Sequence, residues 1–282
     1  MKAPIHLLII DPQNDFCDIP AAELPADPLR AGEAIRPALP VPGAHADMLR
    51  LAAFMRRAGA RMDHVHVTLD SHHPVHIANP SWWTDDAGGA PAPFTTITAA
   101  DLHAGRWRAR NPAWQARSVE YLAALERGGR YVLVVWPEHC LIGHWGHNVH
   151  AAVAEQLDTW ARSKLAVVDY VFKGSNPFTE HYSGVRAEVP DPADPATRGN
   201  PRLVAALSDA QTIVVAGEAL SHCVANTVRD LADALGPAHV EKLVLLDDCA
   251  SSVSGFENFG TDFLREMRAR GMRTASSTTY LA

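Results

Sequence analysis

The sequence of 282 residues lacks the features that mark membrane, secreted or nucleic-acid-binding proteins. It has no run approaching the roughly 18 uninterrupted apolar residues of a membrane span. The opening segment MKAPIHLLIID has neither a long apolar core nor a small-residue cleavage site of a signal peptide. Lys and Arg total 25 against 32 Asp and Glu, so a basic surface for nucleic acid or anionic lipid is not expected. These absences predict a cytoplasmic protein that binds neither nucleic acid nor membrane.

Cysteine is scarce, and no two cysteines form a CxxC pair. In a chain of this length without export signals, such residues are expected to be reduced thiols and not a disulfide framework. Histidine is abundant by contrast, with 15 residues, several of them clustered. The four cysteines are Cys17, Cys140, Cys223 and Cys249.

Apolar, β-branched segments recur along the chain, with helical patterns between them. Near-continuous apolar character is typical of strands buried on both faces, as in a parallel sheet. The alternation predicts an α/β fold, a three-layer α/β/α sandwich around a mostly parallel, doubly wound sheet. The expected strands are 5–10, 63–69, 131–136, 165–172, 212–217, 242–247 and 273–281, and the expected helices are 45–59, 147–162, 200–209, 221–236 and 256–271.

The whole chain, 1–282, is expected to form a single domain with an irregular insertion at about 77–130. This stretch contains AGGAPAP and RWRARNP, followed by the helical pattern AWQARSVEYLAALERGG. Gly- and Pro-rich segments of this kind favour loops over regular structure. We therefore interpret it as an insertion or lid over the carboxyl edge of the sheet.

Reactive side chains follow several of the expected strands. Asp11, Lys173 and Cys223 come after the strands at 5–10, 165–172 and 212–217. Each has an ordinary explanation by itself: a turn residue, a solvated lysine and a small buried thiol. In an open parallel sheet, however, ligands bind beyond the carboxyl ends of the strands. The convergence of these residues at one edge indicates a catalytic site.

The three residue types suit nucleophilic catalysis on a carbonyl. Cys223 is expected at a helix N-terminus, where the dipole and free N–H groups favour a thiolate and can hold an oxyanion. Asp11 is a candidate base that takes the thiol proton and passes it to a leaving amine. The charge of Lys173 favours both the thiolate and the developing oxyanion.

A second group of residues has the chemistry of a metal site. Asp70, His72 and His76 form the pattern D-x-H-x-x-x-H, and His139 offers a third imidazole. One carboxylate with two or more imidazoles suits Zn, Fe or Mn, with water completing the coordination. The alternative is a His-rich surface loop, and His73 in the same loop leaves the ligand set open.

Five motifs in order along the chain resemble those of the isochorismatase-like cysteine hydrolases, and within them the nicotinamidase-type amidases. The resemblance assigns Asp11, Lys173 and Cys223 as catalytic residues and Asp70, His72 and His139 as metal ligands, with His76 as a further candidate. The motifs are LLIIDPQNDFCD, LDSHHPVH (similar to DWHPxNH), VVWPEHCLIG (similar to WPxHC), VFKGSNPFTEHYSG and VAGEALSHCVANTVRD.

The resemblance also implies finer features of the site. It implies a cis peptide between Glu218 and Ala219, and an oxyanion hole formed by the N–H groups of Ala219 and Cys223. It places Phe16, Trp136 and Tyr182 where aromatic residues hold the substrate ring. It further implies a divalent metal, with zinc first and iron or manganese as alternatives, and self-association into a homo-oligomer.

The expected reaction is hydrolysis of a small amide, nicotinamide or a related carboxamide, to acid and ammonia through a thioester on Cys223. Two departures from the family pattern concern the pocket: DSHHP replaces DWHP, and His144-Trp145 replaces Thr-Pro, which is expected to reshape it. A metal-free hydrolase of carbamoyl, maleamate-type or vinyl-ether substrates is the alternative. A non-catalytic or redox thiol protein on the same scaffold is the third interpretation.

Overall fold

The computed structural model describes residues 4–282, so the first three residues of the predicted domain and of the opening segment lie outside it. At its centre is a six-stranded sheet in the order β10-β9-β8-β1-β2-β7, with every neighbouring pair parallel. The predicted three-layer α/β/α fold is therefore confirmed. The strands are β1 Ile5–Ile10, β2 His64–Asp70, β7 Asp169–Lys173, β8 Thr212–Gly217, β9 Leu243–Leu246 and β10 Arg273–Ala275.

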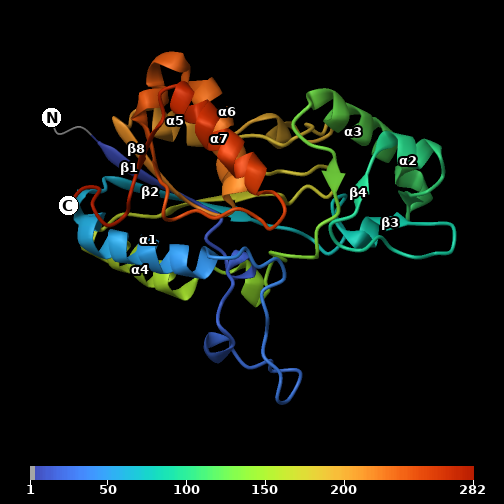
Figure 1. The fold of residues 1–282 in the computed structure, drawn as a ribbon, viewed down its shortest axis with the longest axis horizontal. Coiled ribbons are helices and arrows are strands. Elements are labelled where there is room, and N and C mark those ends of the chain that lie inside the picture. Colours follow the sequence, from blue (N-terminus) through green and yellow to red (C-terminus); the bar gives the residue numbers. More distant parts are fainter. Residues whose placement is uncertain (1–3) are drawn as a thin grey trace.

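Helices cover both faces of this sheet (Figure 1). Helices α1 (Ala44–Ala58) and α4 (Ala151–Lys164) pack together on one face. The other face carries α5 (Pro201–Ser208), α6 (Ala225–Leu235) and α7 (Glu257–Ala269). Each helix buries an apolar stripe against the sheet, which is where most helical stability originates in proteins.

Strand β1 lies in the middle of the sheet, with β2 and β7 on one side and β8, β9 and β10 on the other. It pairs with β2 on one side and with β8 on the other, and Ile10 lies opposite Gly217 at the carboxyl ends. Gly217 has φ 123°, and a Cβ there would lie 2.0 Å from the carbonyl oxygen of Ile10, so only glycine fits. The reversal of strand order between β1 and β8 creates the crevice in which such sheets bind ligands.

The expectation for residues 131–136 is wrong. This segment contributes only the short strand β6 (Leu133–Val134), which pairs antiparallel with β4 (Thr96–Ile97) outside the central sheet. Its backbone forms hydrogen bonds with the insertion instead: the N–H of Trp136 donates to the carbonyl of Ala78 at 2.7 Å. The segment is as apolar as a sheet strand, but it is buried against the insertion.

The insertion folds into a lobe at one side of the sheet (Figure 1, right). Its elements are β3 (Trp83–Thr84), β5 (Arg108–Ala109), α2 (Ala99–His103) and the predicted helix, α3 (Gln115–Gly128). The indole of Trp82 stacks on that of Trp114 with ring centroids 4.3 Å apart. The expected helix is thus present, and the rest of the insertion combines loops with short elements and buried aromatic rings.

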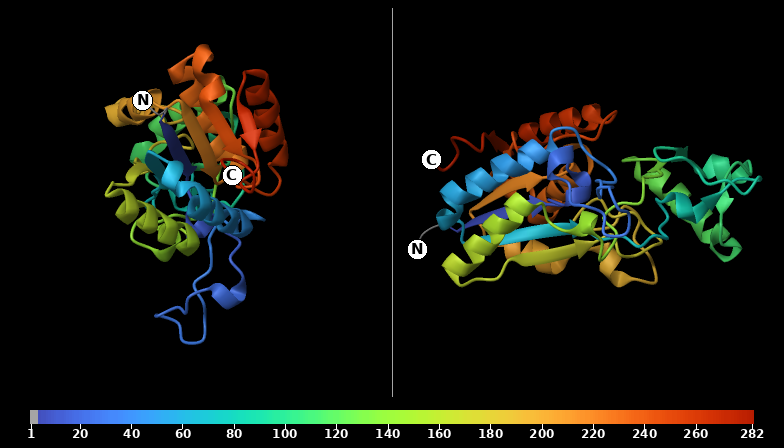
Figure 2. Two further views of the ribbon diagram at one scale, coloured as in Figure 1. Left: turned by 90° about the vertical axis from the view of Figure 1, so that its left-hand side faces the viewer. Right: turned by 90° about the horizontal axis from the view of Figure 1, so that it is seen from below.

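A second excursion, at 18–43, was not predicted and projects away from the helices (Figure 2, dark blue). It contains one short helical turn, Ala21–Glu23, and few other regular contacts. The C-terminal end of this excursion is held against the protein by a hydrogen bond, in which the N–H of Leu39 donates to the carbonyl of Asp15 at 3.0 Å.

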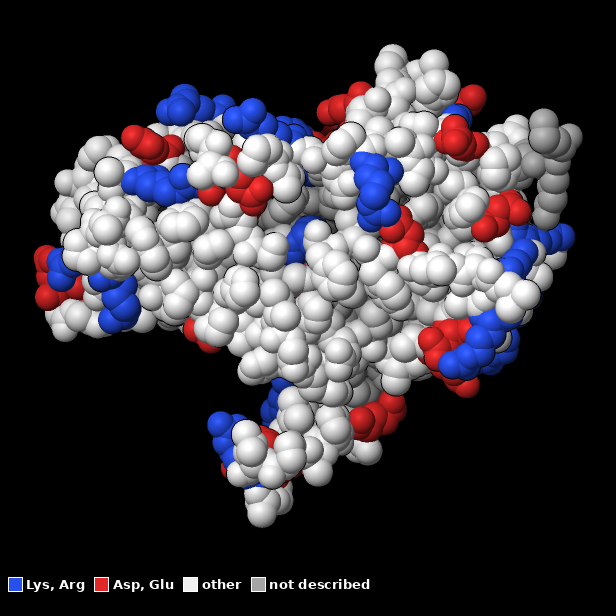
Figure 3. Space-filling view, turned by 180° about the vertical axis from the view of Figure 1, so that it is seen from behind, with Lys and Arg blue, Asp and Glu red and all other residues white. Residues whose placement is uncertain are grey.

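The surface carries mixed charge. Acidic and basic side chains lie close to one another on the face seen from behind (Figure 3). Ion pairs made by exposed arginine side chains include Arg162 with Asp158 and Arg202 with Asp169. Among residues 4–282, no helix has both the length and the apolar character that crossing a membrane requires.

Candidate active site

The structure brings Asp11, Lys173 and Cys223 together at the carboxyl edge of the sheet. The Nζ of Lys173 lies 2.9 Å from Oδ2 of Asp11 and 3.6 Å from Sγ of Cys223. It also lies 3.0 Å from Oδ1 of Asp70. All four side chains are buried, so these contacts act in a medium of low dielectric constant. A carboxylate, an ammonium and a thiol are in mutual reach.

Strand register explains this convergence. Asp11 directly follows β1, and Lys173 ends β7 opposite Asp70 of β2. Thr68 of β2 donates a hydrogen bond from its Oγ1 to Oδ1 of Asp11 at 2.6 Å, which fixes the carboxylate. Gly174 has φ 81°, and a Cβ there would lie 2.7 Å from Oδ1 of Asp70. Glycine is therefore required for the chain to pass this close to the carboxylate.

Electrostatics divide the two carboxylates between different roles. Burial, reinforced by the charge of Asp70, raises the pKa of Asp11 despite the opposing effect of Lys173. Burial also acts to raise the pKa of Asp70, but His72 and Lys173 outweigh it and hold that pKa well below its usual range. Asp11 is therefore the stronger base, while Asp70 stays ionised.

The thiol of Cys223 is deeply buried. It lies in a π-helical turn, Leu220–Val224, that leads into α6. Burial, aided by Asp11 and Asp70, raises the pKa of this thiol well above its usual value although Lys173 opposes the shift. Burial thus outweighs the helix terminus, which by itself favours the thiolate. A thiol in this state needs a base, and Asp11 is the adjacent candidate.

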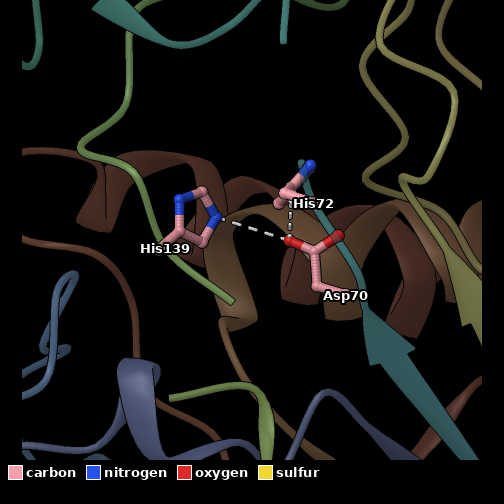
Figure 4. A group of neighbouring side chains, drawn as sticks. All are labelled: Asp70, His72 and His139. Atoms are coloured by element: carbon pink, nitrogen blue, oxygen red, sulfur yellow. Dashed lines mark hydrogen bonds and ion pairs between the residues drawn. The ribbon is translucent and has the colours of Figure 1, made fainter. Parts of the chain in front are cut away.

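Asp70, His72 and His139 form a compact cluster (Figure 4). Their ligand atoms all lie within 4.8 Å of one another. Nδ1 of His139 donates to the carbonyl of Pro137 at 2.7 Å, which directs the Nε2 lone pair towards Asp70. This outer hydrogen bond is typical of metal-binding histidines. One carboxylate and two imidazoles fit a divalent ion such as zinc.

His76 and His73 lie outside this cluster. Both ring nitrogens of His76 are engaged by backbone groups: Nδ1 accepts the N–H of Ala78, and Nε2 donates to the carbonyl of Thr179, each at 3.1 Å. A lone pair for a metal is therefore not free on His76. The side chain of His73 is exposed.

The backbone expected around the nucleophile is present. The peptide between Glu218 and Ala219 is cis. Ala219 and Cys223 both line the pocket in front of the thiol, whereas the carboxyl group of Glu218 turns away and accepts the N–H of Ser251 at 3.1 Å. The assignment of an oxyanion hole to the N–H groups of Ala219 and Cys223 stays a prediction.

The three expected aromatic residues line one pocket, together with Cys223 and with Asp70 and His139 of the metal cluster. Nε1 of Trp136 donates to the hydroxyl of Tyr182 at 3.0 Å, and the ring of Phe16 meets His139 edge-on at 5.4 Å. The cavity between them is about 20 Å³, close to the space of one water, so a ring-sized ligand requires its walls to move apart. The lining residues are Phe16, Leu39, Asp70, Trp136, His139, Glu180, Tyr182, Ala219, His222, Cys223 and Val253.

Several lining residues were not identified from the sequence. Glu180 and His222 lie in quoted motifs without having been singled out, and Leu39 comes from the 18–43 excursion. Conversely, His144 and Trp145 do not line the pocket, so the reshaping expected of them is not seen there. The carbonyl of Trp145 instead accepts the side-chain amide of Asn14 at 2.9 Å.

No family model matches the sequence, and no curated protein matches it in sequence. Solved structures do match over nearly the whole chain. The Acinetobacter baumanii nicotinamidase and pyrazinamidase has a TM-score of 0.63 at 19% identity, covering 99% of this chain and 98% of its own.

Two further structures extend the comparison. The Pyrococcus horikoshii pyrazinamidase in complex with zinc has a TM-score of 0.54 at 17% identity, over 96% of this chain and 98% of its own. An isochorismatase-like hydrolase from Alkaliphilus metalliredigens has a TM-score of 0.51 at 18% identity, over 99% and 98%. The chain therefore has the fold shared by the nicotinamidases and the isochorismatase-like hydrolases, as the five motifs predicted.

Proposed function

We propose that the protein is a cysteine-dependent amidohydrolase of the nicotinamidase type, which converts a small carboxamide such as nicotinamide to its acid and ammonia. The observation that carries the proposal is the position of the Lys173 ammonium, 2.9 Å from Asp11 and 3.6 Å from the sulfur of Cys223. A base, a cation and a nucleophile within hydrogen-bond reach form the machinery of acyl transfer. The fold shared with nicotinamidases supports the same reaction class.

The reaction begins with transfer of the Cys223 proton to Asp11. The sulfur then bonds to the amide carbon, and the carbonyl oxygen gains a negative charge, which the N–H groups of Ala219 and Cys223 receive. Asp11 returns the proton to the amide nitrogen, the C–N bond breaks, and ammonia leaves a thioester. Asp11 next takes a proton from water, whose oxygen adds to the thioester carbon. Loss of the sulfur, reprotonated by Asp11, releases the acid.

Lys173 keeps its proton throughout. Burial acts to lower its pKa, but Asp11 and Asp70 raise it well above the usual value for lysine. The ammonium thus serves as a fixed positive charge beside the sulfur and the carboxylate. It stabilises the transient thiolate after Asp11 has been neutralised by the thiol proton.

Asp70, His72 and His139 would hold a divalent ion, with zinc as the first choice and iron or manganese as alternatives. The zinc complex of the Pyrococcus pyrazinamidase, which has the same fold, supports this assignment. When bound, the ion supplies a Lewis acid beside the pocket that can orient a substrate with a nitrogen or oxygen lone pair. Replacing His72 or His139 by Ala is expected to deplete the metal content of the purified protein, as measured by elemental analysis.

The central test is Cys223→Ala in an ammonia-release assay over nicotinamide, pyrazinamide, maleamate and N-carbamoyl compounds, with and without a chelator. We expect no turnover from the variant, with circular dichroism and metal content unchanged. Cys249→Ala is the matched control, because Cys249 is equally buried but lies outside the pocket, and it should retain activity. Substantial ammonia release by Cys223→Ala would contradict the proposal.

The same assay separates the alternatives. Full activity after chelation, in protein shown to lack metal, would assign a metal-free hydrolase of the same fold. Stoichiometric labelling of Cys223 without ammonia release from any amide would assign a redox or non-catalytic thiol protein.

A further inference from the structure

Asp15 is a buried carboxylate that takes no part in the proposed mechanism. It lies in the helical turn Asn14–Phe16 that follows β1, and it is 6% exposed. Its Oδ2 accepts the N–H of Cys140 at 2.7 Å, and its Oδ1 accepts the N–H of Ala38 at 3.0 Å. Hydrogen bonds to an ionised carboxylate are roughly twice as strong as those between neutral groups. Asp15 therefore joins three segments that are distant in sequence.

Cys140 connects two of the proposed metal ligands. It follows His139 directly in the chain, and its carbonyl accepts the N–H of His72 at 3.0 Å. Its φ of 48° lies in the left-handed region, which residues other than glycine rarely adopt. Such a conformation persists only where the surrounding contacts fix it. The hydrogen bond from Cys140 to Asp15 is one of these contacts, so Asp15 acts on the backbone that carries His139.

The carboxylate of Asp15 is closely packed. A Cβ at Gly146 would lie 2.0 Å from Oδ2 of Asp15, so the turn Trp145–His147 packs directly on it. The backbone of the turn that holds Asp15 is fixed as well, because the N–H of Asn14 donates to the carbonyl of Asn148 at 2.9 Å. A carboxylate held in this way imposes its position on the groups that it binds.

We propose that Asp15 is a positioning residue of the metal site, which holds His139 and His72 in the arrangement that binds a divalent ion. The inference rests on the metal site of the proposed function. The hydrogen bond to the carbonyl of Pro137 orients the ring of His139, whereas Asp15 fixes the backbone next to it. Groups that support metal ligands from outside typically contribute a factor of about 10–100 to metal affinity.

The test is the zinc affinity of the metal-free protein, measured by competition with a chromophoric chelator. In Asp15→Asn, the side-chain oxygen can accept only one of the two N–H groups, and the new NH2 group faces the other. We expect the zinc dissociation constant to rise about 10–100-fold. Circular dichroism of the same metal-free samples shows whether the variant is folded.

Asp18→Asn is the matched control. Asp18 also accepts two backbone N–H groups, from Gly43 and His45 at 2.8 Å each, but these belong to the end of the 18–43 excursion and the start of α1. Its zinc affinity should equal that of the wild type. Gly146→Ala is a second variant of the site: the φ of Gly146 is not positive, so the added methyl group acts by displacing the Asp15 carboxylate, and zinc binding should weaken again.

Two results would overturn the inference. One is a zinc dissociation constant unchanged within about twofold in folded Asp15→Asn or, should that variant fold poorly, in Gly146→Ala. The other is an equal loss of zinc affinity in Asp18→Asn, which would show that loosening the excursion anywhere weakens the metal site.

Zinc affinity and ammonia release separate this inference from the proposed function. A wild-type protein that binds zinc but releases no ammonia from any amide, and whose zinc affinity falls in Asp15→Asn, would refute the amidase and support the role of Asp15. Ammonia release from nicotinamide with a zinc affinity indifferent to Asp15 would support the amidase and refute that role. A wild-type protein that binds no zinc, iron or manganese would refute both the metal site and this inference.

Discussion

Strands β1 and β2 carry a buried polar cluster at each of their ends, and the two clusters are built differently. At the amino ends, Nδ1 of His6 lies 3.1 Å from Nε2 of His66, whose Nδ1 lies 2.9 Å from a carboxylate oxygen of Asp169. At the carboxyl ends, Asp11 and Asp70 share the ammonium of Lys173. The side chains of both clusters are buried, except that Asp169 is partly exposed.

The two clusters differ in how many of their buried polar atoms lack a hydrogen-bond partner. Both ring nitrogens of His66 have partners within the amino-end cluster. Around the carboxyl-end cluster, His72 Nδ1, Glu180 Oε2 and His222 Nε2 are buried without partners. A closed network of this kind stabilises a fold, whereas unsatisfied groups around a pocket are retained for a ligand. The same two strands thus serve structure at one end and chemistry at the other.

The strongest test of this difference between the two ends removes the proposed base, Asp11, at the carboxyl end. Asp11→Asn keeps the shape of the side chain and its hydrogen bond from Thr68 but cannot take the Cys223 proton. We expect kcat/KM for amide hydrolysis to fall by about 10²–10⁴-fold while the melting temperature changes little. Ammonia release and thermal denaturation measure the two effects. Turnover close to that of the wild type would remove Asp11 from the mechanism.

Lys173→Met tests whether the carboxyl-end cluster is held together by charge. The substitution leaves Asp11 and Asp70 buried without their cation, so we expect a loss of about 3–5 kcal/mol in the free energy of unfolding and no turnover. Urea denaturation gives the stability, and adding Asp11→Asn to the same variant should restore part of it. A loss below about 1 kcal/mol would show that the carboxylates do not depend on this ammonium.

The amino-end cluster should respond to pH. Burial and the neighbouring His66 lower the pKa of His6 to about 4, below the roughly 6.5 of an unfolded histidine. The unfolded chain therefore binds more protons between these values. The contribution of His6 to stability is complete above about pH 6.5 and is lost as the pH falls towards 4, by at most about 3 kcal/mol.

The measurement is the difference in unfolding free energy between the wild type and His6→Gln, from pH 7.5 to 4.5. Other buried histidines titrate in this range too, and the difference between the two proteins removes their effect. We expect the wild type to lose more stability than the variant on acidification. Parallel curves would show that His6 does not contribute.

The smallest expected effect is that of Asp169→Asn, at the opposite end of β7 from Lys173. The amide can still accept from His66, but its pairing with Arg202 weakens, so we expect a loss of about 1 kcal/mol or less. Activity should be unchanged. A large loss of turnover would mean that the two ends of the strand are coupled.

The parts of the site that follow from sheet topology could be predicted from the sequence. Asp11, Asp70 and Lys173 end apolar runs, and a parallel sheet brings such residues to one edge. Residues 131–136 could not be placed, because YVLVVW has the same pattern whether it is buried in the central sheet or against the insertion. The spacing of His76 is that of a metal ligand, but the sequence does not show that backbone groups hydrogen-bond to both nitrogens of its ring.

The protonation state of the thiol and the surroundings of Glu180 depend on contacts between distant segments. The position of Cys223 before a helix favoured a thiolate, but the depth of burial that reverses the effect is a property of the assembled core. Glu180 has no local signal of its own. Its surroundings are set by Tyr121 on the insertion lobe, 59 residues away in sequence.

This hydrogen bond from the backbone of Glu180 to Tyr121 ties one wall of the pocket to a lobe that supplies none of the proposed catalytic residues. For engineering, substitutions in helix α3 therefore offer a way to move this wall of the pocket without replacing Asp11, Lys173 or Cys223.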